Sequence, residues 1–62
     1  MTLNEFADAL WASAVCIRVA GQKKGHDFKS ISAACEQFGF YNVINSFSYG
    51  IYSIAINVEV PE

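Results

Sequence analysis

Residues 41–60, YNVINSFSYGIYSIAINVEV, decide the fold that we predict for this chain. Their β-branched and aromatic side chains favour strands. Tyr49-Gly50, in the middle of the segment, supplies a turn, and a four-residue loop from Ser48 to Ile51 would give the same register. The segment therefore predicts one β-hairpin, which Pro61 ends.

This hairpin register sorts the side chains onto two faces. One face is apolar except for Asn45, and its cross-strand pairs are Tyr41 with Val58, Val43 with Ile56, Asn45 with Ile54 and Phe47 with Tyr52. The other, more polar face carries Asn42, Ile44, Ser46, Ser53, Ala55 and Asn57. A sheet with one polar face is expected to have helices on its other side only.

A helix is expected at the N-terminus. Thr2 and Glu5 have the spacing of a capping box, in which each side chain accepts a hydrogen bond from the other residue's backbone N–H. At helical periodicity, one apolar face gathers Leu3, Phe6, Ala7, Leu10 and Ala14.

Residues 15–20 fit a strand better than a continuation of this helix. Apolar Val15, Ile17 and Val19 alternate with Cys16, Arg18 and Ala20. A longer helix that reaches Ala20 is the alternative, because no Gly or Pro marks the junction.

A loop and a second helix are expected next. Residues 21–25 carry two glycines and two adjacent lysines and predict a loop. Asp27 is then expected to cap a helix that ends at Gly39, a residue favoured just after a helix. The apolar face of this helix would hold Phe28, Ile31, Ala34, Cys35 and Phe38.

The order helix, strand, helix, hairpin defines the predicted fold class. We expect one small α+β domain over residues 1–62, with a three-stranded, mainly antiparallel sheet and two helices on one face.

The chain is short for its apolar content. It has 62 residues, of which 53% are hydrophobic, and so short a domain buries only about 60% of the surface of its unfolded chain. Two cysteines and a single histidine form neither a disulfide framework nor a four-ligand zinc site. We expect no metal and no cofactor. Association with a partner is therefore the remaining way in which so small a domain could gain stability.

Charge and hydropathy exclude other classes. The net charge is −2 with four Lys and Arg, which argues against nucleic-acid binding as the main activity. Acidic residues interrupt the N-terminal segment early, so a signal peptide is not expected, and no charge-free apolar run is long enough for a transmembrane helix. We therefore expect a soluble, intracellular protein that does not bind a membrane.

Catalytic and phosphate-binding patterns are weak. Cys16 or Cys35 could pair with His26, but no third group orients such a pair, so we predict that the protein is not an enzyme. Lys23, Lys24, His26 and Lys29 surround a glycine-bearing loop, yet the order of a phosphate-binding loop is absent and a solvated loop is the simpler interpretation.

Candidate contact residues are acidic or aromatic. Glu5 and Asp8 form a small acidic patch on the first predicted helix, with ordinary solvated positions as the alternative. Tyr49 and Ile51 are assigned to contact, because half-exposed aromatic and apolar residues near a turn supply binding energy at interfaces. Trp11 fits contact and the border of the core equally well. Phe40, Tyr41 and Tyr52 are assigned to the core.

In its size, mild acidity, helix-and-hairpin plan and lack of enzymatic motifs, the chain resembles the small phage-encoded anti-CRISPR proteins, particularly inhibitors of type I effector complexes. This resemblance of overall character implies a protein that acts in the host cytoplasm, binds a Cascade subunit or the nuclease, and blocks target DNA. The residues expected to contact this partner are Glu5, Asp8, Trp11, Glu36, Tyr49 and Glu59. The alternatives are a homo-oligomeric structural or accessory subunit, such as a homodimer, and a small nucleic-acid-binding regulator.

Overall fold

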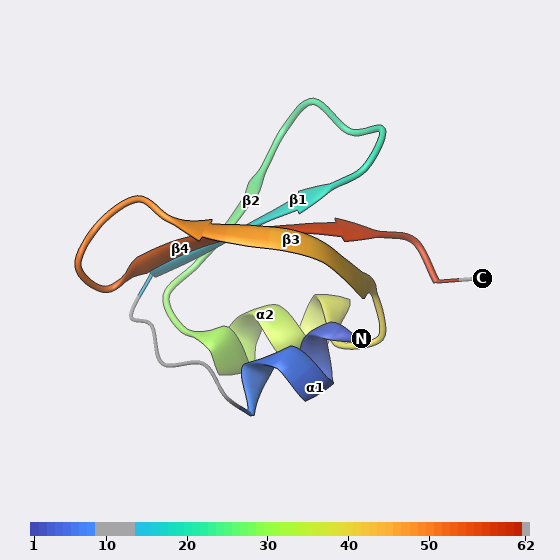
Figure 1. The fold of residues 1–62 in the computed structure, drawn as a ribbon, viewed down its shortest axis with the longest axis horizontal. Coiled ribbons are helices and arrows are strands. Elements are labelled where there is room, and N and C mark those ends of the chain that lie inside the picture. The colour runs from blue at the N-terminus through green and yellow to red at the C-terminus, as the bar shows by residue number, and fades with distance from the viewer. Residues whose placement is uncertain (9–13, 62) are drawn as a thin grey trace.

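The fold is a four-stranded mixed sheet with two helices on one face (Figure 1). The computed structural model describes residues 1–8 and 14–61. The elements, in chain order, are α1 (Leu3–Ala7), β1 (Ala14–Val19), β2 (His26–Phe28), α2 (Ile31–Phe38), β3 (Asn42–Ser48) and β4 (Ser53–Glu59). The strand order is β2-β1-β4-β3, and only the central β1–β4 pair is parallel. The predicted α+β class and the placement of both helices on one face are confirmed. The predicted number of three strands was wrong, because β2 adds a fourth.

The N-terminal capping box forms as predicted. The Thr2 hydroxyl accepts from the Glu5 N–H at 3.3 Å, and Glu5 Oε1 accepts from the Thr2 N–H at 2.9 Å. Leu3 is fully buried, and α1 ends at Ala7. The predicted continuation to Leu10 and the junction before β1 lie outside the described residues.

The strand assignment of the following segment is confirmed, and the longer helix is wrong. In β1, Val15, Ile17 and Val19 are buried, while Arg18 between them is exposed. One side of β1 therefore faces the helices. Cys16 and Arg18 lie on the other face of the sheet, which neither α1 nor α2 covers (Figure 1) and which we call the open face.

The second helix begins later than predicted, because its first residues form a strand. His26–Phe28 pairs antiparallel with β1 as β2, and Asp27 lies opposite Cys16 instead of capping a helix. Ser30 is the actual cap, and its hydroxyl accepts from the Ala33 N–H at 3.2 Å. Asp27 and Ser30 can both cap a helix, but Asp27 is part of the strand that pairs with β1, so Ser30 is the cap.

The hairpin prediction is correct, but its register is wrong. Val43 lies opposite Val58, a two-residue shift that leaves every side chain on its predicted face. A β-bulge between Val43 and Asn45 then adds one unpaired residue, which shifts the register by one more position. The side chains of β3 after the bulge therefore lie on the face opposite to the predicted one. Asn45 consequently lies opposite Asn57, and Phe47 reaches the open face of the sheet.

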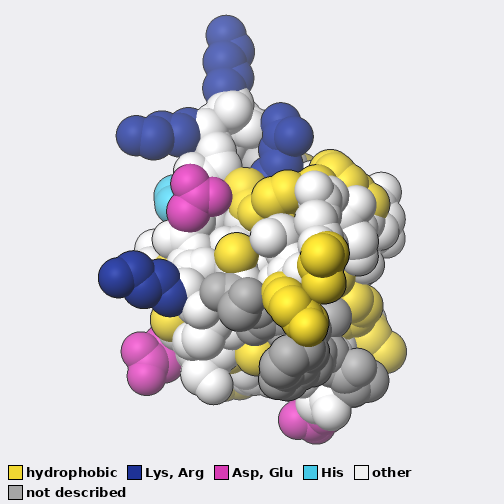
Figure 2. Space-filling model, turned by 90° about the vertical axis from the view of Figure 1, so that its left-hand side faces the viewer, with side chains coloured by type: hydrophobic (Ala, Val, Ile, Leu, Met, Phe, Trp, Pro, Cys, Tyr) yellow, Lys and Arg dark blue, Asp and Glu magenta, His cyan; other side chains and the backbone are white. Residues whose placement is uncertain are grey.

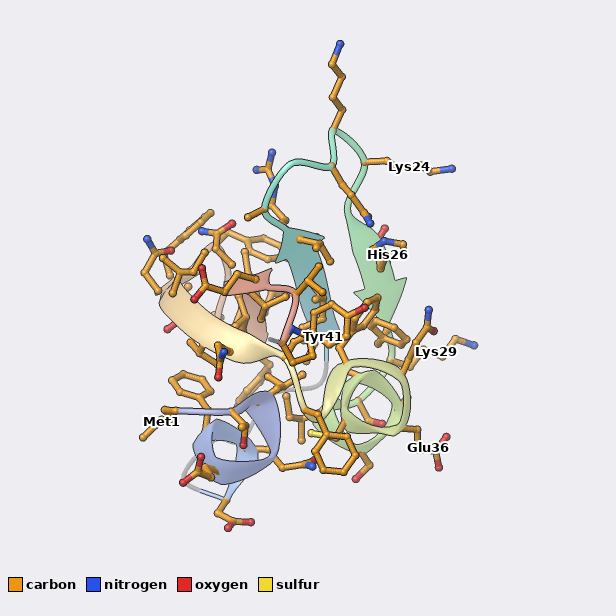
Figure 3. All side chains as sticks on the ribbon, turned by 90° about the vertical axis from the view of Figure 1, so that its right-hand side faces the viewer. Met1, Lys24, His26, Lys29, Glu36 and Tyr41 are labelled. Atoms are coloured by element: carbon orange, nitrogen blue, oxygen red, sulfur yellow. The ribbon has the colours of Figure 1, made fainter. Side chains whose placement is uncertain are left out.

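The core lies between the helices and the sheet. Its fully buried side chains are Leu3, Val15, Ile17, Ile56 and Val58. Phe38 of α2 closes one end of this core, with its ring centroid 4.9 Å from that of Tyr41 and 5.0 Å from that of His26. Figure 3 shows Tyr41 pointing inward between α2 and the sheet.

Gly39 ends α2 for a reason other than the predicted one. Its φ of −57° is an ordinary helical angle, so the left-handed freedom of glycine is not used. A Cβ at this position would lie 2.5 Å from the Asn4 side-chain oxygen, and the Asn4 N–H donates to the Gly39 carbonyl at 2.9 Å. The missing side chain therefore lets α1 approach the end of α2 closely.

Candidate functional site

The most prominent surface feature is a group of exposed apolar side chains at the turn of the β3–β4 hairpin. We call Phe47, Tyr49, Ile51 and Tyr52 the hairpin patch; their exposed fractions are 50%, 55%, 91% and 52%. The turn forms one end of the molecule (Figure 1), and this end faces the viewer in Figure 2, where hydrophobic side chains gather over it. An apolar group concentrated at one place is typical of a contact surface, whereas scattered apolar residues are not.

The structure shows which of the aromatic residues weighed for contact or core are exposed. Tyr49 and Ile51 are exposed as predicted, and Tyr41 packs against the core as predicted. Tyr52 was assigned to the core and is half exposed. Phe40, also assigned to the core, is 77% exposed and lies between the end of α2 and the start of β3. Trp11 lies outside the described residues.

The sequence signal that could have found Phe47 is weak. Strict alternation places Phe47 on the same side as Val43, and only the bulge at Ile44 turns it to the open face. No residue type in the segment marks a bulge, since the bulged position is an ordinary Ile.

The predicted acidic contact residues are exposed but are distributed over three elements. Glu5 and Asp8 lie at α1, Glu36 on α2 and Glu59 at the end of β4. Figure 3 shows Glu36 pointing away from α1. The structure therefore brings Glu5 and Asp8 together but does not join them to the other acids or to Tyr49.

Glu5 is also engaged within the protein. The Thr2 backbone N–H and, secondarily, the Thr2 hydroxyl hold the pKa of Glu5 below its ordinary value of 4.5. Both groups donate to the charged carboxylate and so favour the ionised form. Asp8, Glu36 and Glu59 are the acidic side chains better placed to meet a partner.

A shallow groove crosses the open face of the sheet beside the β1–β2 loop. Its volume is about 350 Å³, and its lining residues include Arg18 of β1, Ile44 and Asn45 of β3, and Asn57 of β4. The Asn57 side-chain NH₂ donates to the Asn45 side-chain oxygen at 2.5 Å. Lys23 and Lys24 are exposed in the loop, which rises on the side opposite the helices (Figure 1), and Figure 2 shows Lys and Arg side chains projecting around it.

The structure does not bring Cys16 and His26, considered above as a nucleophile pair, to the same face of the sheet. Cys16 lies opposite Asp27 on the open face, whereas His26 faces the helix side, where its ring packs on Phe38. His26 Nε2 lies 3.1 Å from Gln22 Oε1. Burial, followed by a hydrogen bond to Asp27, raises the pKa of the Cys16 thiol, so the reactive thiolate is disfavoured.

The thiolate of Cys35 is disfavoured as well. Burial is the main cause of the raised pKa of the Cys35 thiol, with a smaller effect from the charge of Asp8.

Among residues 1–8 and 14–61, no group of three or more His, Cys, Asp or Glu side chains could hold a metal ion. Within the same residues, no helix has the length and apolar character needed to cross a membrane.

Comparison with protein-family models, with curated proteins and with solved structures gave no match. The functional argument therefore depends on the surfaces of this chain.

Proposed function

We propose that this protein is a non-enzymatic inhibitor that binds a protein partner and acts by covering a surface that the partner needs. The hairpin patch is the single observation that carries this proposal. Its four apolar side chains lie at one end of a 62-residue domain, and each of them is at least half exposed. Aromatic side chains supply large contact areas with few rotatable bonds, and such residues dominate the energy of protein interfaces.

A subunit of a type I CRISPR effector is the partner that we propose, on the basis of the resemblance in size, acidity and plan. Such a partner holds target DNA with cationic side chains. Asp8, Glu36 and Glu59 lie apart from the hairpin patch and would meet cations elsewhere on the partner. Charge complementarity of this kind raises the association rate and fixes orientation. Glu5 is a weaker candidate, because its carboxylate already accepts from Thr2.

The direct test is inhibition of target-DNA binding by a reconstituted Cascade-type complex. We expect the protein, added before the DNA, to reduce DNA binding in a dose-dependent way. Tyr49→Ala should raise the inhibitory concentration by about tenfold or more, the size expected of an aromatic hot spot.

The matched control is Phe40→Ala, which removes an even more exposed aromatic ring at the other end of the hairpin. It should leave inhibition unchanged. If the wild-type protein at large excess neither bound the complex nor altered DNA binding, the proposed partner would be rejected. Equal losses in both variants would instead reject the hairpin patch as the contact.

A second candidate function is favoured by the groove on the open face. Of the four Lys and Arg residues, Arg18 lines this groove, and Lys23 and Lys24 follow its lining residue Gln22 along the β1–β2 loop. A small regulator that binds single-stranded nucleic acid would use these cations for phosphates and Phe47 for base stacking. Binding of a labelled oligonucleotide that weakens steeply with salt would support this function, and no binding at low salt would exclude it.

A further inference from the structure

The first part of the β3 edge is covered by the N-terminal segment. The Leu3 N–H donates to the Tyr41 carbonyl at 2.9 Å, and the Val43 N–H donates to the Met1 carbonyl at 2.8 Å. Thr2 lies between them and forms an antiparallel bridge with Asn42. Chain residues 1–3 thus add a short pairing segment to β3, and this cover ends at Val43.

The hydrogen-bonding pattern identifies the backbone groups of β3 that face outward beyond this point. In an antiparallel pair, alternate residues direct their N–H and C=O groups to the neighbouring strand. Tyr49 donates its N–H toward β4 at 3.2 Å, so Asn45 and Phe47 also face β4, and Ser46 and Ser48 face away from it. Among residues 1–8 and 14–61, none pairs with Ser46 or Ser48 on this outer side.

This part of the edge also lacks the usual protection against strand pairing. Natural edge strands are protected by charges, by proline, by short length or by a covering element. No charged residue and no proline occurs between Glu36 and Glu59. Within the part of the chain that the structure describes, the bulge at Ile44 is the one protective feature of this segment, and it lies at the start of the open part.

We propose that the open part of β3, residues 44–48, pairs antiparallel with the same five residues of a second copy of this chain, about a twofold axis at Ser46. Ser46 is the midpoint of the open part, and its N–H and C=O both face outward. In the dimer, the Ser46 N–H of each copy donates to the Ser46 carbonyl of the other. Ser48 of each copy lies opposite Ile44 of the other, and the two sheets become one continuous sheet with both helix layers on the same side.

The length of the open part fits this pairing. Met1 occupies the edge at Val43, and β3 ends at Ser48, where the hairpin turn begins. The pair of Ser48 with Ile44 of the second copy is therefore the last one possible, because the next position along the second copy, Val43, is covered by that copy's own Met1. On the open face, Phe47 of each copy comes beside Asn45 of the other, at the short spacing of a pair without mutual hydrogen bonds.

A second copy suits this edge better than a foreign strand. Because β3 is uncharged, self-pairing brings no like charges together across the ladder, and the edge offers no charge by which a foreign partner could be selected. The pairing does not depend on the inhibitor function proposed above. It leaves Tyr49, Ile51 and α1 outside the ladder, so a dimer can still present two hairpin turns.

The first test measures mass and amide exchange on the wild-type chain. Light scattering and sedimentation, from about 1 μM to 1 mM, should show a reversible monomer–dimer equilibrium of the moderate strength expected of a small interface. Amide hydrogen exchange at Ser46 and Ser48 should slow as the concentration rises, while exchange at Asn45 and Phe47, already bonded to β4, should not depend on concentration.

Two results of this test would overturn the proposal. One is a chain that stays monomeric throughout, whether or not it binds another protein. The other is a dimer in which exchange at Ser46 and Ser48 stays fast, because that dimer would use the open face or the hairpin patch. Neither result bears on whether the protein inhibits a CRISPR effector.

The second test uses Ser46→Pro with Ser46→Ala as its matched control. Proline removes an N–H that makes no bond within the monomer, a position where edge strands tolerate it, but it takes both central hydrogen bonds from the dimer. The dissociation constant of the dimer should rise by about 30-fold or more for Ser46→Pro and change little for Ser46→Ala, which keeps the N–H. Far-ultraviolet circular dichroism checks that each variant is folded, and equal affinity of the two folded variants would contradict the proposed axis.

Discussion

β2 and β3 form the two edges of the same sheet, and they differ in length, charge and cover. β2 has three residues, carries Asp27 at its centre and lies between Lys24 and Lys29. β3 has seven residues, no charge, and a cover that reaches only Val43. Short length and charge are the common ways in which proteins prevent unwanted strand pairing. Because only one edge is protected, we propose the other edge, and the hairpin patch that continues it, as the side used for contact.

The two edges also differ in how they are held to the core. β2 has β1 as its only strand neighbour and depends on Phe38, whose ring lies 5.0 Å from that of His26 and 5.9 Å from that of Phe28. β3 has the longer pairing with β4 and the additional N-terminal cover. Protection from pairing and attachment to the core are thus separate properties, and substitutions can change one without the other.

The largest effect is expected for Phe38→Ala, which removes the anchor of the β2 edge. Truncating a buried phenylalanine costs about 3–5 kcal/mol of unfolding free energy, a large part of the stability of a domain this small. Urea unfolding followed by circular dichroism measures this loss. Phe40→Ala is the control, and its exposed ring should contribute less than about 0.5 kcal/mol. Similar losses in both variants would contradict the placement of Phe38 in the core.

A smaller effect is expected for Thr2→Ala, which loosens the cover of the β3 edge. Loss of a capping hydroxyl costs about 1 kcal/mol, and it should also release Met1 and Leu3 from β3. Amide exchange at Val43 should therefore accelerate more than exchange at residues of β1. Thr2→Ser keeps the hydroxyl and should behave like the wild type; if it destabilised as much as Thr2→Ala, the hydroxyl would not be the stabilising group.

The same cap predicts a pH dependence. Because hydrogen bonds from Thr2 lower the pKa of Glu5 in the folded state, its contribution to stability is present above its ordinary value of 4.5. This contribution is lost as the pH falls through the lowered pKa. Glu5→Gln keeps a capping side chain without the charge, so the stability difference between it and the wild type should shrink below pH 4.5. A difference that stayed constant from neutral to acid pH would contradict this assignment.

Local patterns in the sequence were sufficient for the elements that depend on neighbours in the chain. The Thr2–Glu5 capping box, the alternation of Val15, Ile17 and Val19, and the apolar face of α2 are set by residues a few positions apart. Periodicity and side-chain reach decide these features, and both can be read from one segment.

Features decided by pairing between distant segments could not be predicted in the same way. β2 is three residues long, and Asp27 is equally acceptable as a cap or as an outward strand residue. The bulge at Ile44 follows from fitting β3 against both β4 and the N-terminal segment, which no local pattern encodes. Since the bulge decides which face Phe47 takes, the hairpin patch could be predicted only in part, at Tyr49 and Ile51.

The smallest effect is expected for Asp27→Asn, which removes the charge at the centre of the β2 edge. After burial, the hydrogen bond and the charge of Asp27 are the main causes of the raised pKa of the Cys16 thiol. Removing the charge should lower this pKa and speed alkylation of Cys16 by iodoacetamide near neutral pH by roughly 1.4- to 5-fold, the size of one exposed charge interaction. Cys35 is the internal control, because its raised pKa has burial and Asp8 as its causes, so its rate should stay the same. Equal acceleration at both cysteines would mean that the substitution had loosened the whole fold, and no acceleration at Cys16 would mean that the charge on the β2 edge does not reach the open face beside it.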